Sequence, residues 1–136
     1  MKRETLILKR PLPQTMLAHL QAAYPLEACG ILAGPPGQAV HQYAIDNIRQ
    51  SPVAYEMDPQ QQLQAMLDLE ARGWEMVAIY HSHPAGPERP SPTDIAQAYY
   101  PDCAYIIASL ADRAAPVLRG FRIENGRFHE ITLITE

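Results

Sequence analysis

The chain has 136 residues, of which 47% are hydrophobic and 19% are charged, and its formal net charge is −4. A chain of this length has room for one domain that buries a core without disulfide bonds, so we predict a single domain over residues 1–136. Its charge pattern offers no basic patch for nucleic acid, and its apolar runs fall short of the roughly 20 residues of a membrane-spanning helix.

The N-terminal part of the chain predicts strands and helices in alternation. Residues Thr5–Lys9 are expected to form a short strand, and Gln14–Tyr24 follow helical spacing after a proline-rich turn. The small apolar run Ala28–Ala33 indicates a buried strand, and Gln38–Ile45 is expected to pair with it as a hairpin. The polar segment Asp46–Glu56 is then expected to be an exposed loop.

A second helix is predicted to begin at Asp58, because an aspartate followed by a proline is typical of a helix start. Leu63, Met66 and Leu67 are expected to face the core from this helix. Gly73 is expected to end it.

The C-terminal part predicts a central strand at Trp74–His83 and a short helix from Ser91 to about Tyr99. Asn125-Gly126 is a strong signal for a type I′ hairpin turn. Three strands are expected in this part, at Cys103–Leu110, Pro116–Glu124 and Arg127–Thr135. The predicted fold class is α/β (α+β), with a mixed, largely antiparallel β-sheet and two or three flanking helices.

Two histidines and an aspartate have the spacing of a metal site. Residues i and i+2 of a strand project to the same face, so His81 and His83 can present their imidazoles side by side. Asp94, after a loop and at a helix start, can add a carboxylate oxygen. Three such ligands leave a fourth position open, as in catalytic zinc sites, where zinc lowers the pKa of a bound water to about 7.

A catalytic site of this kind also needs groups that do not bind the metal. Glu27 directly precedes a buried strand, where a charged residue is unusual, so it is the candidate general acid/base. Ser91 could donate a hydrogen bond to the oxyanion that develops during the reaction.

Each of these residues also has a structural interpretation. Histidines at a strand end are often surface or packing residues, and an isolated glutamate is usually a solvated charge. Ser91 and Asp94 have the spacing of a helix capping box, which needs no further function. The occurrence of all these residues together at these spacings is much less expected by chance than the occurrence of any one of them.

The loop between His83 and Asp94 contains four prolines, Pro84, Pro87, Pro90 and Pro92. Proline restricts φ and lowers the conformational entropy of a loop. We therefore expect this loop to be stiff and to hold the third ligand near the first two.

The segments Glu27–Gly34, His81–Pro84 and Ser91–Asp94 together resemble the signature of the JAMM (MPN-plus, Mov34-like) metalloprotease family. That signature is a glutamate, then HxH, seven residues, serine, two residues and aspartate. The stretch Ser51–Pro59 and the ending Val117–Ile134 also resemble small prokaryotic members, so the resemblance covers nearly the whole chain.

The resemblance implies a JAMM/MPN fold, which is cytidine-deaminase-like, and one Zn²⁺ per chain. It implies that His81, His83 and Asp94 bind zinc, that Glu27 is the acid/base and that Ser91 supports the tetrahedral intermediate. It further implies cleavage of amide or isopeptide bonds after the C-terminal glycine of a ubiquitin-like or sulfur-carrier protein. The compact chain has no obvious insertion for gripping ubiquitin, so sulfur carriers are the expected substrates.

Other functions remain open at this stage. Some members of this fold lack metal ligands and act only as scaffold or binding modules, and RadC-like relatives of unclear role share the HxH…S…D pattern. A nucleobase deaminase would need H-x-E and P-C-x-x-C, and neither motif is present.

The remaining histidines and cysteines are expected to have structural roles. His19, His41 and His129 lack partners at ligand spacing, and Cys29 and Cys103 are expected to be free thiols. The apolar segment after the basic N-terminus is too short for a signal peptide, so we predict a cytoplasmic protein.

Overall fold

The computed structural model describes residues 3–136, so the first two residues of the basic N-terminus lie outside the described part. The helices are α1 (Leu12–Ala23), α2 (Pro59–Ala71) and α3 (Pro92–Ala96). The strands are β1 (Thr5–Leu8), β2 (Cys29–Gly34), β3 (Gln38–Ala39), β4 (His41–Ile45), β5 (Glu75–His83), β6 (Ala104–Ser109), β7 (Val117–Glu124) and β8 (Arg127–Thr135). The expectation of a mixed sheet with flanking helices is confirmed.

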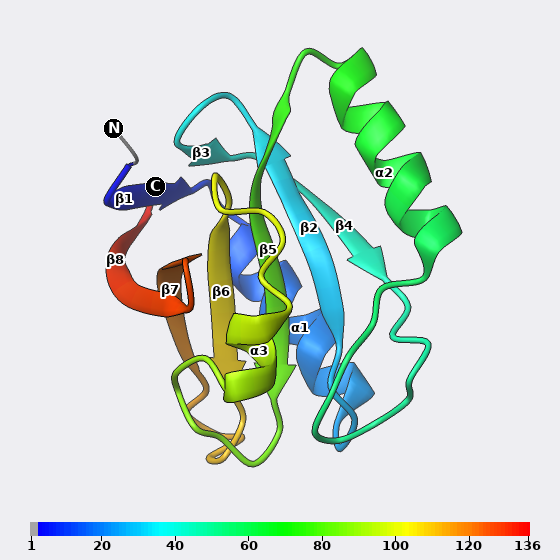
Figure 1. Cartoon of the computed structure of the whole chain (residues 1–136), viewed down its shortest axis with the longest axis vertical. Helices are drawn as coiled ribbons and strands as arrows, with labels where there is room; N and C mark the ends of the chain where they lie inside the picture. The colour runs from blue at the N-terminus through cyan, green and yellow to red at the C-terminus, as the bar shows by residue number, and fades with distance from the viewer. Residues whose placement is uncertain (1–2) are drawn as a thin grey trace.

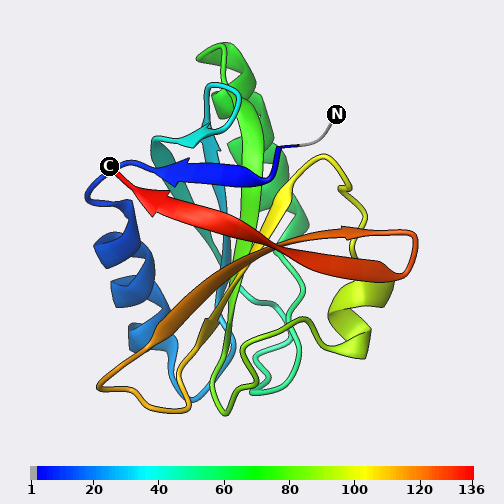
Figure 2. The same cartoon turned by 90° about the vertical axis from the view of Figure 1, so that its left-hand side faces the viewer.

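The strands form one eight-stranded sheet in the order β3-β1-β8-β7-β6-β5-β2-β4. Strand β1 pairs in parallel with β3 and β8, and β5 pairs in parallel with β6, whereas the other neighbours are antiparallel. Figure 2 shows β1 and β8 lying side by side in the upper half of the view. The edge strands β3 and β4 are separated in sequence only by Val40, and the sheet is nearly closed.

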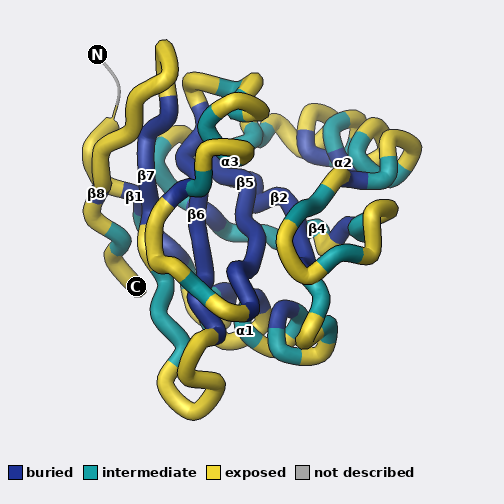
Figure 3. The backbone as a smooth tube through the Cα atoms, turned by 60° about the horizontal axis from the view of Figure 1, so that its bottom comes forward, coloured by how far each residue is buried: buried dark blue, intermediate teal, exposed yellow. Residues whose placement is uncertain are grey.

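Helices pack on both faces of the sheet. In Figure 1, α1 lies behind the sheet and α3 lies in front of it. Met16 and Leu20 of α1 belong to the same hydrophobic cluster as Tyr80 of β5. On the other face, the cluster contains residues of α2 together with Ile79 and Ile107. The central strands β2, β5 and β6 run between these layers and are buried along most of their length (Figure 3). Among residues 3–136, no helix has the length and hydrophobicity needed to cross a membrane.

The predicted core face of α2 is wrong. Leu63 and Leu67 are 56% and 59% exposed, whereas Ala65 and Leu69 are buried and Met66 is half-buried. A shift of two residues rotates a position by about 200° around a helix, so the buried pair lies on nearly the opposite side from the exposed leucines. The two leucines are therefore available to solvent.

The remaining differences concern the ends of elements and one strand pairing. The segment Gln38–Ile45 does not form one hairpin arm: β3 pairs in parallel with β1, and only β4 pairs with β2. Helix α1 begins at Leu12, two residues earlier than expected, because proline is tolerated in a first helical turn. Helix α3 ends at Ala96 and is shorter than expected. The hairpin turn is confirmed, since Asn125 and Gly126 have φ values of 54° and 73°.

Candidate metal centre

Two histidines lie at the C-terminal end of β5, on the face of the sheet that α2 and α3 cover. The alternation of the strand places His81 and His83 on the same side as Ile79, which belongs to the core of that face. His81 and His83 are only 1% and 4% exposed. The tertiary structure thus buries the pair of imidazoles that the sequence pattern placed side by side.

Asp94 reaches the histidines from the first turn of α3. The Ser91 backbone N–H donates to Oδ2 of Asp94 at 2.9 Å, and the Asp94 N–H donates to the Ser91 hydroxyl oxygen at 3.0 Å. This reciprocal pair is a complete capping box. The structural interpretation of these two residues is therefore correct, and the same cap holds the carboxylate toward β5.

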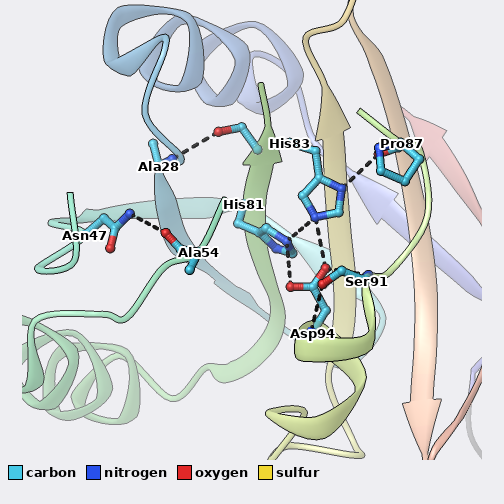
Figure 4. A network of polar contacts seen from close by, with 9 residues as sticks. Ala28, Asn47, Ala54, His81, His83, Pro87, Ser91 and Asp94 are labelled. Atoms are coloured by element: carbon cyan, nitrogen blue, oxygen red, sulfur yellow. Dashed lines mark hydrogen bonds and ion pairs between the residues drawn. The ribbon is translucent and has the colours of Figure 1, made fainter. Parts of the chain in front are cut away.

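The three side chains converge on one point (Figure 4). Nε2 of His81 lies 3.0 Å from Nε2 of His83 and 3.2 Å from Oδ1 of Asp94, and Nε2 of His83 lies 2.9 Å from Oδ2. Ligands placed tetrahedrally around a zinc ion with bonds of about 2.0 Å lie about 3.3 Å apart. The spacing and the two-nitrogen, one-oxygen donor set therefore fit a metal ion. Within residues 3–136 this is the one such group of three potential ligands.

The proline-rich loop fixes one of the imidazoles. Nδ1 of His83 donates to the carbonyl oxygen of Pro87 at 2.8 Å, because a carbonyl can only accept. A neutral His83 ring then has its lone pair on Nε2, which faces the other ligands. Such a partner for the second ring nitrogen is typical of metal-binding histidines. The sequence indicated a stiff loop here, but it did not show that the Pro87 carbonyl orients the His83 ring.

The electrostatics of the three potential ligands favour a cation. In the metal-free protein, burial tends to raise the pKa of Asp94, but hydrogen bonds from His81 and from a protonated His83 hold it well below its usual range. Burial lowers the pKa of His81, and its Nδ1 is buried with no hydrogen-bond partner. Burial also acts to lower the pKa of His83, but Asp94 and the Pro87 carbonyl raise it overall.

Glu27 lies next to this cluster and is only 5% exposed. Cys29 of β2 is paired with His81, so continuing the antiparallel register by two residues brings Glu27 alongside His83. One carboxylate oxygen, Oε1, is buried without a hydrogen-bond partner. Burial raises the pKa of Glu27 to about 8, with His83 opposing the shift and Asp94 adding to it. A carboxyl group in this state can exchange a proton near neutral pH.

The Ser91 side chain has a hydrogen-bond donor to spare. Its oxygen accepts the backbone N–H of Asp94, and a hydroxyl can accept and donate at the same time. The hydroxyl proton is therefore available for another acceptor beside the cluster.

Tyr55 is a site residue that the sequence analysis missed. Its ring stacks on His81, with ring centroids 4.5 Å apart and planes inclined by 30°. It comes from the segment Asp46–Glu56, which the sequence predicts to be an exposed loop but which gives no sign of a contact with His81. Only its aromatic character within a polar segment could have indicated its half-buried position.

A cavity of about 330 Å³ opens beside Tyr55, between the loop after β4, helix α2 and the end of α3. Its lining includes Ile79, which is two residues before His81 on β5. Aromatic and charged groups line the rest, among them Tyr99, Tyr100, Tyr105 and Arg49. Because Tyr55 both lines this cavity and stacks on His81, the cavity is adjacent to the candidate metal centre.

The other histidines and cysteines lie outside the cluster. Cys29 and Cys103 are free and buried, and burial raises both thiol pKa values to about 12. His19 contacts the Tyr80 hydroxyl, and His129 pairs with Glu4. His41 packs against Tyr43 and Trp74. The expected structural roles of the three histidines are confirmed.

Sequence comparison matches residues 9–124 to the family described as prokaryotic homologs of the JAB domain. A CysO-cysteine peptidase of Mycobacterium tuberculosis is 36% identical over 127 residues, which cover 92% of this chain and 87% of that protein. A probable TtuB-protein conjugate cleaving protease of Thermus thermophilus is 40% identical over 94 residues, covering 68% of this chain and 63% of that one. A desampylase of Haloferax volcanii is 36% identical over 88 residues, covering 62% and 63% respectively.

Solved structures share the fold. A protein from Desulfitobacterium hafniense matches with a TM-score of 0.87 and 38% identity, covering 96% of this chain and 92% of that one. A JAB1/MPN domain protein from Archaeoglobus fulgidus matches with a TM-score of 0.61 and 18% identity, covering 96% and 98%. The second likeness shows the fold alone, and it confirms the expected JAMM/MPN architecture.

Proposed function

The chain belongs to the prokaryotic JAB-domain family of JAMM/MPN metalloproteases, and from this premise we propose that it is a zinc-dependent peptidase. Its substrates would be conjugates of ubiquitin-like or sulfur-carrier proteins, cleaved at the amide bond after the C-terminal glycine. The relatives named above include a CysO-cysteine peptidase and a probable TtuB-protein conjugate cleaving protease, which supports this substrate class.

One observation carries the proposal: three ligand atoms converge beside a buried glutamate that has an unpartnered oxygen. Imidazole nitrogens with a carboxylate suit zinc among the common divalent metals. His81, His83 and Asp94 would hold the ion. Zinc held by such ligands supplies Lewis-acid chemistry and lowers the pKa of water to about 7.

The remaining steps belong to protein side chains. Glu27, with its pKa raised to about 8, would take a proton from the attacking water and return it to the leaving amine. Ser91 would donate its free hydroxyl proton to the developing oxyanion. Replacing Ser91 by alanine should lower turnover by about 100-fold and, through loss of the cap, destabilise the fold by about 1 kcal/mol.

The cavity beside Tyr55 would receive the substrate tail. Its wall includes Arg49, Tyr55 and Glu56 from the segment Asp46–Glu56, which we expect to lie along an extended peptide. Deleting Ser51–Ala54 tests this role of the segment. Unchanged peptide turnover in the deletion variant would exclude it.

A direct assay tests the reaction. Zinc-loaded protein is incubated, with and without a chelator, with a sulfur-carrier protein that bears cysteine or a short peptide after its terminal Gly-Gly. Mass spectrometry should detect cleavage after the glycine that the chelator abolishes. Metal analysis that finds no zinc after zinc exposure would instead favour a scaffold role.

We also propose a cytoplasmic location, which the free thiols support. Cys29 and Cys103 are both unpaired, and a reducing compartment keeps thiols in that state.

A further inference from the structure

The backbone of Glu27 is held by the loop after β4 and not by the sheet. Its N–H donates to the carbonyl oxygen of Ser51 at 2.8 Å. Its own carbonyl oxygen accepts from Nδ2 of Asn47 at 2.9 Å. Strand β2 begins only two residues later, at Cys29. The loop therefore supplies the hydrogen bonds of the Glu27 N–H and carbonyl, whereas the next residue, Ala28, is bound to Ser82 of β5.

Asn47 uses every hydrogen-bonding position of its side-chain amide. Nδ2 donates to the carbonyl oxygens of Glu27 at 2.9 Å and of Ala54 at 3.1 Å, the second of which is drawn in Figure 4. Oδ1 accepts the backbone N–H groups of Arg49 and Glu56, both at 3.0 Å. An amide has two donors and two lone pairs, so no capacity is left over.

The carboxylate of Glu27 has no comparable support. Its Oε1 is buried without any hydrogen-bond partner, so no such bond fixes that oxygen. The position of the carboxylate then depends on the backbone to which it is attached and on packing. Because the proposed proton transfers need distances close to hydrogen-bond length, a displaced backbone would disturb them.

From these contacts we infer that Asn47 is a positioning residue for Glu27. Its amide ties the Glu27 carbonyl to Arg49 and Glu56, which line the cavity beside the metal centre. One side chain thus sets the distance between the wall of the cavity and the proposed acid/base. This inference rests on the proposed function, because it assigns Asn47 to the same reaction.

Aspartate is the informative replacement at this position. Asn47→Asp keeps the oxygen that accepts from Arg49 and Glu56, but it removes the donors to Glu27 and Ala54. We expect kcat to fall by about 100-fold, KM to stay within about twofold and the metal content to be unchanged. Asn47→Ala, which loses all four bonds, should be at least as impaired.

Gln61→Ala is the matched control. The Gln61 amide also makes two hydrogen bonds to this loop, donating to the Asp46 carboxylate and accepting from the Asp46 N–H, but it does not touch Glu27. A variant that loses these bonds should keep the wild-type kcat. A general softening of the loop would instead lower kcat in both variants.

Hydrogen exchange supplies a readout that does not depend on activity. The amide of Glu27 should exchange at least about tenfold faster in Asn47→Asp than in the wild type or in Gln61→Ala. Wild-type kcat in Asn47→Asp, or unchanged exchange at Glu27, would overturn the inference. If the wild-type protein cleaves no carrier conjugate, the proposed function fails, whereas the exchange experiment still decides whether Asn47 anchors Glu27.

Discussion

Strand β5 carries polar side chains on both faces, and the two sets differ in how their hydrogen bonds are completed. On the face that α1 covers, the Tyr80 hydroxyl accepts from Gln42 at 2.9 Å and lies 2.7 Å from Nδ1 of His19. The Ser82 hydroxyl oxygen accepts the Ala28 N–H at 3.0 Å. Each of these hydroxyl groups has protein partners, as buried polar groups in a stable core do.

On the opposite face, some buried polar groups lack hydrogen-bond partners. Nδ1 of His81 and Oε1 of Glu27 are buried without partners, and the ligand atoms of His81, His83 and Asp94 converge on one another. Buried polar groups that lack partners reduce stability, and they are retained where an ion or a reaction uses them. Neighbouring residues of one strand therefore complete their hydrogen bonds on one face and form the candidate metal centre on the other.

The largest effect should come from removing a ligand. His83→Ala deletes the imidazole that contacts both His81 and Asp94, so the protein should lose its bound metal together with its peptidase activity. Metal analysis and the carrier-cleavage assay measure these two losses. Stoichiometric zinc in the folded variant would show that this face does not hold metal as proposed.

Glu27→Gln should separate metal binding from turnover. The variant keeps the size of the side chain but cannot transfer the proton, so kcat should fall by about 10² to 10⁴-fold. The zinc content should stay at the wild-type level, because Glu27 is not among the three ligands. Full activity of this variant would contradict the assigned role.

In the metal-free protein, the same variant should also change how stability depends on pH. The pKa of Glu27 is raised from 4.5 to about 8, so the folded state binds this proton more tightly than the unfolded state. The stabilisation is complete below pH 4.5 and is lost as the pH rises through about 8. Thermal melts in chelator should give Glu27→Gln a Tm at pH 9 about 5 °C above that of the wild type, with little difference at pH 4. Equal pH profiles would show that Glu27 is not buried as a neutral acid.

The smallest effect is expected on the α1 face. Tyr80→Phe removes the hydroxyl shared by Gln42 and His19, which should cost about 1 kcal/mol of stability. Turnover and zinc content should be unchanged, because the Tyr80 side chain lies on the side of β5 away from the ligands. A variant that folds but loses activity would break the division of β5 into a structural face and a chemical face. Denaturant melts beside the cleavage assay measure both quantities.

The sequence by itself determined those parts of the molecule that depend on a few neighbouring residues. The HxH spacing placed His81 and His83 on one face of a strand, and the capping box placed Asp94 in a first helical turn. The Asn-Gly turn was equally local. These predictions held because strand alternation, helix caps and tight turns follow from backbone geometry over two to four residues.

Only the tertiary structure decided the features that depend on distant partners. It paired β3 with β1, turned Leu63 and Leu67 of α2 toward solvent, and set Tyr55 against His81. It also brought the amide of Asn47 to the backbone of Glu27. Which surface covers a side chain, and which carbonyl meets a donor, depends on segments far apart in the chain. The spacing of residues therefore predicted that His81, His83 and Asp94 could come together, whereas long-range packing supplied the groups around them.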